Sequence, residues 1–125
     1  MINARSATLA LLLTLPPACS AWAAGDAVRG EARFQDCAPC HKLEAGVNNV
    51  GPSLHGIFTR KAGEIADFRY SPAMKRSGIV WTPETLEKFI SDPQAMVPGN
   101  RMPYAGMAGA SDRADLIAYL QNATK

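Results

Sequence analysis

The sequence predicts an all-α fold in one domain, and three observations support this prediction. Apolar residues recur at helical spacing in three segments, and capping residues precede two of them. No segment shows the apolar–polar alternation of a half-buried strand. The stretch 92–107 contains three prolines and two glycines, which disfavour both helix and strand. We therefore expect a few helices joined by long irregular loops.

The first and last predicted helices lie near the two ends of the domain. The first covers about Asp26–Asp36, and its expected buried residues are Val28, Ala32 and Phe34. The last begins after Ser111, whose side chain is expected to cap it. Its apolar residues at helical spacing are Leu116, Ile117 and Leu120.

The middle predicted helix has the clearest boundaries. Thr82 is its expected N-cap, Pro83 occupies the first turn, and the pair Asp92-Pro93 ends it. The residues expected on its buried side are Leu86, Phe89 and Ile90.

Residues 1–24 have the organisation of a secretory signal peptide. Arg5 provides the positive start, Ala7–Leu15 the apolar run, and Ala21–Ala24 the small-residue cleavage signal. The run is shorter than the roughly 20 residues that a membrane span needs. The alternative is an uncleaved N-terminal anchor, which Pro16 and the proline after it disfavour because they end the run. We predict a mature domain of residues 25–125 that is exported to the periplasm.

The composition of the predicted mature domain limits its partners. The leader contains one of the 13 Lys and Arg residues and none of the 11 Asp and Glu residues, so the domain is nearly neutral. No run of basic residues alternates with aromatic ones, and we therefore expect no nucleic-acid partner. Cys19 lies in the leader, which leaves two cysteines in the domain.

These two cysteines, Cys37 and Cys40, occur in the motif CAPCH with His41. A disulfide between them would close a very small loop, where the entropic benefit is least. A thioredoxin-like dithiol needs a strand that runs into a helix at the motif, and here a helix precedes it. Zinc needs four ligands, and His55 is the only other histidine that could complete the set.

Covalent haem accounts for every position of the motif. Each thiol can add to one haem vinyl group, and the histidine that follows the second cysteine then lies under the iron. C-x-x-C-H therefore predicts one haem c, attached through thioethers from Cys37 and Cys40, with His41 as an axial ligand.

The sixth iron position decides between two functions. An open position would suit gas binding or peroxide chemistry, whereas a filled one favours electron transfer. The available side chains are those of His55, Met74, Met96, Met102 and Met107. Met102 is preferred because it lies in the loop 92–107, which Pro98 and Pro103 stiffen. Met96 and Met107 remain possible, and His55 is expected to be a hydrogen-bonding loop residue.

The motifs CAPCH, GPSLHG, WTPETLEKFISDP, PGNRMPYAGM and RADLIAYLQNAT, in this order, resemble those of class I cytochrome c. The similarity extends over Gly25–Lys125 and is closest to the mitochondrial and bacterial branch with a long methionine loop. It implies an all-α fold around one haem, with His41 and Met102 as axial ligands. It also implies a monomeric electron carrier that is not an enzyme, and redox protein partners that dock at an exposed haem edge.

The resemblance assigns further roles residue by residue. Gly30 and Phe34 on the first helix are implied to meet Leu116 and Tyr119 on the last. The Pro52 carbonyl is implied to accept a hydrogen bond from the axial histidine. The implied propionate donors are Arg60, Tyr70 and Trp81, and the implied neighbours of the haem edge are Asn100 and Tyr104. Without the resemblance, the three donors would be interpreted as a surface charge and two core aromatics.

The chain also departs from this family's pattern. Phe89 replaces a tyrosine and Met74 replaces an asparagine, so two polar groups near the axial methionine are absent. The residues at positions where relatives have lysines are Glu31, Asp36 and Gln94. A positive docking face is therefore not assumed. The alternative function is a haem protein with a displaceable methionine that binds ligands or reacts with peroxide.

Overall fold

The computed structural model describes residues 24–125. The predicted signal peptide, Cys19 included, lies outside the described residues except for Ala24. The described helices are α1 (Ala27–Phe34), the 3-10 helix η1 (Ile57–Thr59), α2 (Pro72–Arg76), α3 (Pro83–Ser91), α4 (Pro93–Met96) and α5 (Ala110–Ala123). Between residues 24 and 125 the only β-type pairing is an isolated bridge between Lys61 and Val80. The all-α prediction is confirmed.

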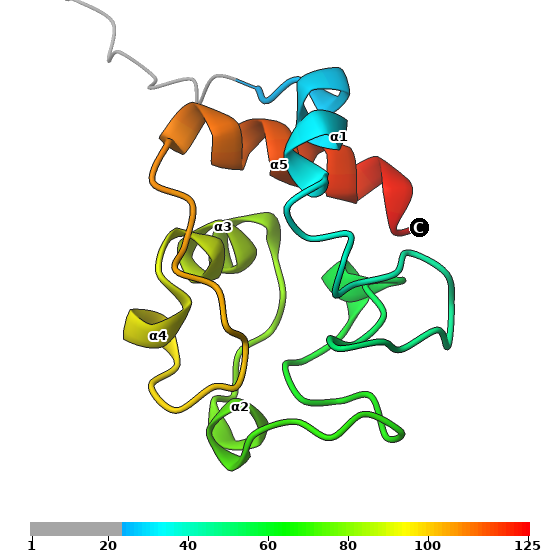
Figure 1. The fold of residues 1–125 in the computed structure, drawn as a ribbon, viewed down its shortest axis with the longest axis vertical. Helices are drawn as coiled ribbons and strands as arrows, with labels where there is room; N and C mark the ends of the chain where they lie inside the picture. The colour runs from blue at the N-terminus through cyan, green and yellow to red at the C-terminus, as the bar shows by residue number, and fades with distance from the viewer. Residues whose placement is uncertain (1–23) are drawn as a thin grey trace, which may run out of the picture.

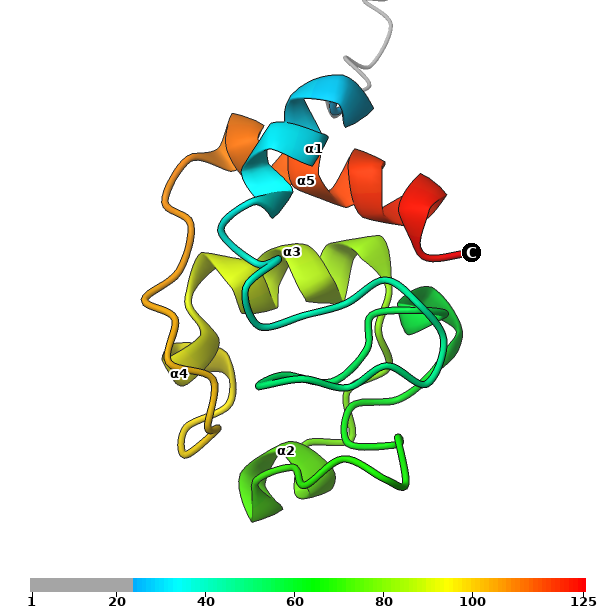
Figure 2. The same ribbon diagram turned by 45° about the vertical axis from the view of Figure 1, so that its right-hand side comes forward.

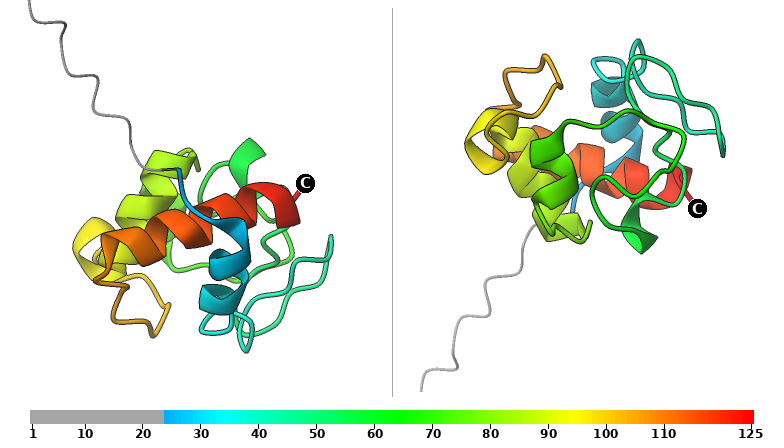
Figure 3. Two further views of the ribbon diagram at one scale, coloured as in Figure 1. Left: turned by 90° about the horizontal axis from the view of Figure 1, so that it is seen from above. Right: turned by 90° about the horizontal axis from the view of Figure 1, so that it is seen from below.

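The helices form a short stack along the long axis of the molecule. Helices α1 and α5 pack together at one end, α2 lies at the other end, and α3 lies between them (Figures 1 and 2). Irregular segments 35–56 and 97–109 connect these levels. The two segments lie on opposite sides of the molecule (Figures 1 and 3). Residues of both segments line one cavity, which is large enough to be considered as a cofactor site.

The crossing of α1 and α5 depends on Gly30. A Cβ atom at this position would lie 1.9 Å from the Asp115 carbonyl oxygen, so only glycine permits the approach. The rings of Phe34 and Tyr119 then pack in a tilted arrangement at a centroid distance of 5.5 Å. The expected contact between these two helices is confirmed.

Two expectations for α1 are wrong. Val28 is 80% exposed and Ala32 is also exposed, whereas Gly30 and Phe34 are buried. An eight-residue helix that crosses one neighbour buries only the residues at the crossing, here four positions apart. The helix also ends at Phe34 instead of near Asp36, and residues 35–40 form turns.

The buried carboxylate of Asp115 holds the start of α1 against α5. Its Oδ1 accepts from the Asp26 backbone N–H at 2.6 Å, and its Oδ2 accepts from Arg29 Nε at 2.8 Å. Asp115 is only 3% exposed. The Arg29 hydrogen bond, followed by the bond from the Asp26 backbone, lowers the pKa of Asp115 below its usual value.

The caps of α3 agree with expectation, and that of α5 does not. Thr82 forms a capping box with Thr85, Pro83 occupies the first turn, and α3 buries its predicted apolar residues. Helix α5 begins after Gly109, so Ser111 lies inside its first turn and is not the cap. The Gly109 carbonyl already accepts the first helical bond, from the Arg113 backbone N–H at 3.0 Å.

The stretch 92–107 is partly helical, in contrast to the predicted irregular loop. Asp92 ends α3 and caps the short helix α4 by accepting from the Ala95 N–H at 3.0 Å. Pro93 fits at the first position of α4 because no hydrogen bond is needed from its nitrogen there. The helix stops at Met96, and residues 100–109 have no regular structure.

Candidate cofactor site

A cavity of about 310 Å³ opens between the helices and the two irregular segments. Its lining includes all ten residues singled out as cofactor-binding: Cys37, Cys40, His41, Pro52, Arg60, Tyr70, Trp81, Asn100, Met102 and Tyr104. These residues come from several separate segments between positions 37 and 104, and the tertiary structure brings the segments together. The remaining lining is mostly apolar and includes core residues of α3 and α5.

The CAPCH motif forms consecutive turns directly after α1. The Cys37 N–H donates to the Phe34 carbonyl at 2.8 Å, and the His41 N–H donates to the Cys37 carbonyl at 2.9 Å. Both thiols are free and partly buried. Burial raises the pKa of Cys37 to about 11, with a smaller contribution from Asp36. This shift is opposite to the lowered pKa of a reactive dithiol.

The ring of His41 is fixed by the next segment of the chain. Nδ1 lies 2.8 Å from the Pro52 carbonyl oxygen, and since that oxygen can only accept, Nδ1 carries the proton. Nε2 therefore keeps its lone pair for a metal. Burial is the main cause that lowers the pKa of His41, and the charge of Arg60 lowers it further. The imidazole is therefore neutral at pH 7.

Gly51 also determines where this ring lies, and the sequence interpretation missed it. A Cβ atom on Gly51 would lie 2.3 Å from Cε1 of His41. No larger residue fits unless the ring or the backbone moves. The only sequence signal was a glycine before Pro52, which is also typical of an ordinary turn.

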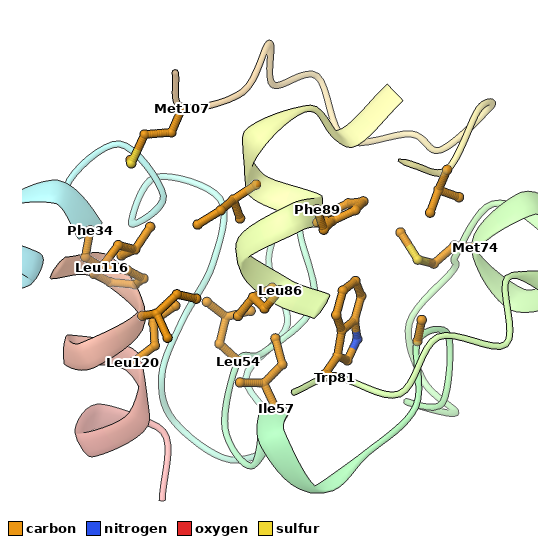
Figure 4. Packing of buried hydrophobic residues seen from close by; sticks show 14 residues of the cluster. Phe34, Leu54, Ile57, Met74, Trp81, Leu86, Phe89, Met107, Leu116 and Leu120 are labelled. Carbon is orange, nitrogen blue, oxygen red and sulfur yellow. The ribbon is translucent and has the colours of Figure 1, made fainter. Parts of the chain in front are cut away.

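Among the candidates for the second axial ligand, only Met74 and Met102 line the cavity. Met107 is buried beside Phe34, on the far side of α3 from Met74 (Figure 4). Met96 ends α4 and does not line the cavity. His55 is exposed and lines a separate shallow surface hollow, so it does not join the potential zinc ligands of the CAPCH motif.

Met102 is positioned by the buried side chain of Asn100. Asn100 Oδ1 accepts from the Met102 backbone N–H at 2.8 Å. Its Nδ2 donates to the carbonyls of Pro93 at 2.8 Å and Val97 at 2.9 Å. The loop that carries Met102 is thus bound to both ends of α4. Asn100 acts here chiefly through the backbone rather than as a simple lining residue.

Arg60 provides a half-buried positive charge at another part of the wall. Its Nη1 and Nη2 donate at 2.5 Å to the carbonyls of His55 and Ser53, respectively. Among the described residues no carboxylate forms a salt bridge with it. Burial lowers the pKa of Arg60, but a guanidinium stays charged. This wall can therefore accommodate an anionic group.

The aromatic site residues line the wall in different ways. Trp81 is 7% exposed and makes an edge contact with Phe89 at a centroid distance of 5.2 Å. Burial raises the pKa of Tyr70, and the nearby Arg60 partly opposes this rise. Burial, then Cys37 and Asp36, raise the pKa of Tyr104.

The donor set fits a covalently held haem. Two free thiols, a neutral imidazole with a free Nε2 and a thioether line one apolar cavity, and the guanidinium of Arg60, which forms no salt bridge within residues 24–125, provides a counter-charge. Nowhere from residue 24 to 125 do three or more His, Cys, Asp or Glu side chains form a group that could hold a metal ion. Within the same range, no helix is long and apolar enough to cross a membrane.

The chain is similar to known proteins in both sequence and fold. A family model described as "Cytochrome c" matches residues 27–124. "Cytochrome c2 iso-2" of Magnetospirillum fulvum is 46% identical over 89 residues, which cover 71% of this chain and 93% of that protein. "Cytochrome c" of Arabidopsis thaliana is 43% identical over 103 residues, which cover 81% and 92%. The solved structure of cytochrome cH from Methylobacterium extorquens matches with a TM-score of 0.73 and 42% identity, covering 78% of this chain and 98% of that one.

Proposed function

The chain belongs to the cytochrome c family, whose members are electron carriers with one covalently attached haem c, and on this premise we propose how its residues hold that group. Cys37 and Cys40 would hold it through two thioethers, and His41 and Met102 would bind its iron. The observation that carries the proposal is that these four side chains line one cavity.

The two axial side chains differ in what holds them. The imidazole of His41 is oriented by the Pro52 carbonyl, and the lack of a side chain on Gly51 leaves space for the ring. Met102 is oriented through its own backbone by Asn100. Each side chain thus has a support of its own within the fold, so little rearrangement would accompany a change of iron charge.

The bound haem supplies the one-electron chemistry, and the protein controls its surroundings. The apolar lining from α3 and α5 excludes water and disfavours the extra charge of ferric iron, as the soft thioether also does. Arg60, Tyr70 and Trp81 hold the anionic propionates, with Arg60 providing the charge. Phe89 places no hydroxyl in this lining, so Met102 receives no hydrogen bond from that position.

The destination and the partners follow from the sequence. We propose that residues 1–24 are removed as a signal peptide and that the domain of residues 25–125 works as a monomer in the periplasm. Its partners are redox proteins, which approach the cavity where exposed Arg101 and half-buried Tyr104 line it.

One experiment tests the attachment. The purified protein is extracted with acidified acetone and weighed by mass spectrometry. The colour should stay with the protein, and the mass should exceed that of residues 25–125 by one haem. A Cys37→Ser variant should show the altered spectrum of a single thioether. Extractable haem in the unchanged protein would disprove covalent attachment.

A second experiment tests the axial methionine. Ferric protein with methionine ligation has a weak near-infrared band from sulfur-to-iron charge transfer. Met102→Ala should abolish this band and open the iron to cyanide. Met74→Leu is the matched control, because Met74 is the other methionine in the cavity lining, and the band should persist. The reverse result would assign the ligand to Met74.

The alternative function, ligand binding or peroxide chemistry, depends on a displaceable Met102. The absence of polar side chains at Met74 and Phe89 is the observation in its favour. This alternative function requires the unchanged ferric protein to bind cyanide rapidly at neutral pH. The three hydrogen bonds of Asn100 oppose such displacement, and we therefore place this function second.

A further inference from the structure

The loop that carries Met102, residues 97–109, joins α4 to α5 along one side of the molecule (Figure 2). We call it the methionine loop. Its first end is bound to α4 by the side chain of Asn100. Its last residues lead into α5, and the side chain that binds them is that of Arg113, near the start of α5. The two ends of the loop therefore have separate attachments.

Arg113 binds three groups at the far end of the loop. Its Nη1 donates to the Met107 carbonyl at 2.7 Å and to the Ala108 carbonyl at 2.8 Å, and its Nε donates to Glu87 Oε1 of α3 at 2.5 Å. The side chain of Arg113 is 14% exposed and that of Glu87 is 20% exposed. Because the guanidinium is planar, the bond to Glu87 also sets the direction of Nη1. A largely shielded ion pair thus ties the end of the loop to α3 and α5.

Backbone contacts hold the same end of the loop against α3. The Met107 N–H donates to the Ile90 carbonyl at 2.8 Å. A Cβ atom on Gly106 would lie 2.3 Å from the Ser91 carbonyl oxygen, and the φ of Gly106 is 108°, so this close approach requires glycine. The end of the loop cannot leave α3 unless these contacts and the Arg113 bonds are lost together.

Met102 lies between the two attachments, two positions after Asn100 and four positions before Gly106. So short a segment can move away from the cavity only if one attachment gives way. We propose, on the basis of the axial role assigned to Met102 above, that Arg113 is a positioning residue for Met102. Together with Glu87 it keeps the far end of the loop on α3, and this limits how often the thioether leaves its place in the cavity wall.

Cyanide binding to the ferric holoprotein measures how often the loop opens, since cyanide reaches the iron only when Met102 has left it. Arg113→Gln removes the ion pair and the fork of donors, whereas Glu87→Gln removes the ion pair alone. At neutral pH and saturating cyanide, Arg113→Gln should bind cyanide about tenfold faster than the unchanged protein, because hydrogen bonds to a charged group are lost. Glu87→Gln should have an intermediate rate, and both variants should keep the sulfur charge-transfer band before cyanide is added.

Two control variants separate positioning from general stability. Arg33→Gln breaks an exposed ion pair between α1 and α5, to Asp112, and should leave the cyanide rate unchanged. Asp115→Asn alters a buried carboxylate whose hydrogen bonds are to Asp26 and Arg29, outside the methionine loop. It should lower the free energy of unfolding in guanidinium chloride without changing the cyanide rate.

The outcomes separate this inference from the proposed function. Equal cyanide rates in Arg113→Gln, Glu87→Gln and the unchanged protein would overturn the role of Arg113. An increase in Asp115→Asn as large as that in Arg113→Gln would also overturn it, because the rate would then follow general stability. If Arg113→Gln gives no folded holoprotein, the comparison of Glu87→Gln with the unchanged protein decides. An unchanged protein without the sulfur charge-transfer band would instead overturn Met102 as a ligand, and with it the proposed function.

Discussion

The side-chain oxygen of Asn100 accepts a hydrogen bond from the backbone N–H of Met102 at 2.8 Å. Its amide group also donates to the carbonyls of Pro93 and Val97, so one buried side chain satisfies three backbone groups. Asn100 is 8% exposed, which leaves little opportunity for water to replace it. Asn100 therefore ties the methionine loop to α4.

Asn100→Ala should loosen the loop and weaken methionine ligation. Loss of the amide leaves buried backbone groups without partners, at a cost of about 1–3 kcal/mol in the free energy of unfolding. The sulfur charge-transfer band should then disappear at lower pH than in the unchanged protein. The control is Asn49→Ala, because Asn49 is exposed and its one bond is to Pro39. If the two variants lose the band at the same pH, Asn100 does not position Met102.

Gly51→Ala should disturb the proximal side of the site. The added methyl group would lie 2.3 Å from the His41 ring, so the ring must move away from the Pro52 carbonyl. Overpacking of this kind costs about 1–3 kcal/mol. Denaturant unfolding measures the loss, and NMR of the reduced protein should show a changed His41 Nδ1–H signal. Val50→Ala, the adjacent exposed position, should leave that signal in place, and an unchanged signal in Gly51→Ala would contradict the close contact.

Asp115→Asn should change how stability depends on pH. The pKa of Asp115 is lowered in the folded protein, chiefly by Arg29, so its stabilisation is complete above the unfolded pKa of about 3.9. That stabilisation is lost as the pH falls through the folded pKa. The variant should therefore be less stable than the unchanged protein at pH 7, and the two should converge in strong acid.

Urea unfolding at several pH values tests this dependence. The matched control is Asp112→Asn, which removes the salt bridge to Arg33. The side chain of Arg33 is 50% exposed and that of Asp112 is 39% exposed. It should have little effect, since exposed pairs contribute about 0–1 kcal/mol. A constant difference between Asp115→Asn and the unchanged protein at every pH would show that the carboxylate charge is not what matters.

Methionine ligation should persist to unusually high pH in the ferric protein. Replacement by an amine needs a lysine that can lose its proton near the iron, and the stretch 92–104 contains no lysine and no histidine. Its only cation is Arg101, and a guanidinium has no lone pair to offer the iron. Lys88 is in the last turn of α3, which would have to unwind. A pH titration of the charge-transfer band gives the midpoint, and magnetic resonance identifies the ligand that replaces sulfur.

Lys88→Ala tests whether the last turn of α3 unwinds so that the lysine can reach the iron. If the prediction holds, the variant should have the same alkaline midpoint as the unchanged protein, with hydroxide as the new ligand. A nitrogen-ligated form that appears near pH 9 and disappears in Lys88→Ala would contradict it.

The sequence alone determined the features that depend on local chemistry. The CAPCH spacing needs only one turn of chain to place two thiols and an imidazole together. The N-cap at Thr82 and the stop at Asp92 also involve residues at most a few positions apart. Such patterns are readable because the interacting groups are neighbours in the chain, and the structure retains them.

Tertiary packing alone decided the features that depend on distant segments. Val28 is exposed because a short helix buries only the residues at its crossing with α5. Met74 rather than Met107 shares the cavity with Met102 because α2 and α3 set which sulfur faces it. Gly51 matters because the His41 ring lies against it, and nothing in a glycine's own sequence context reports what it will touch. Whether a side chain is buried, and what it touches, depends on segments that are distant in the sequence. A local pattern therefore narrows the possible contacts but does not determine them.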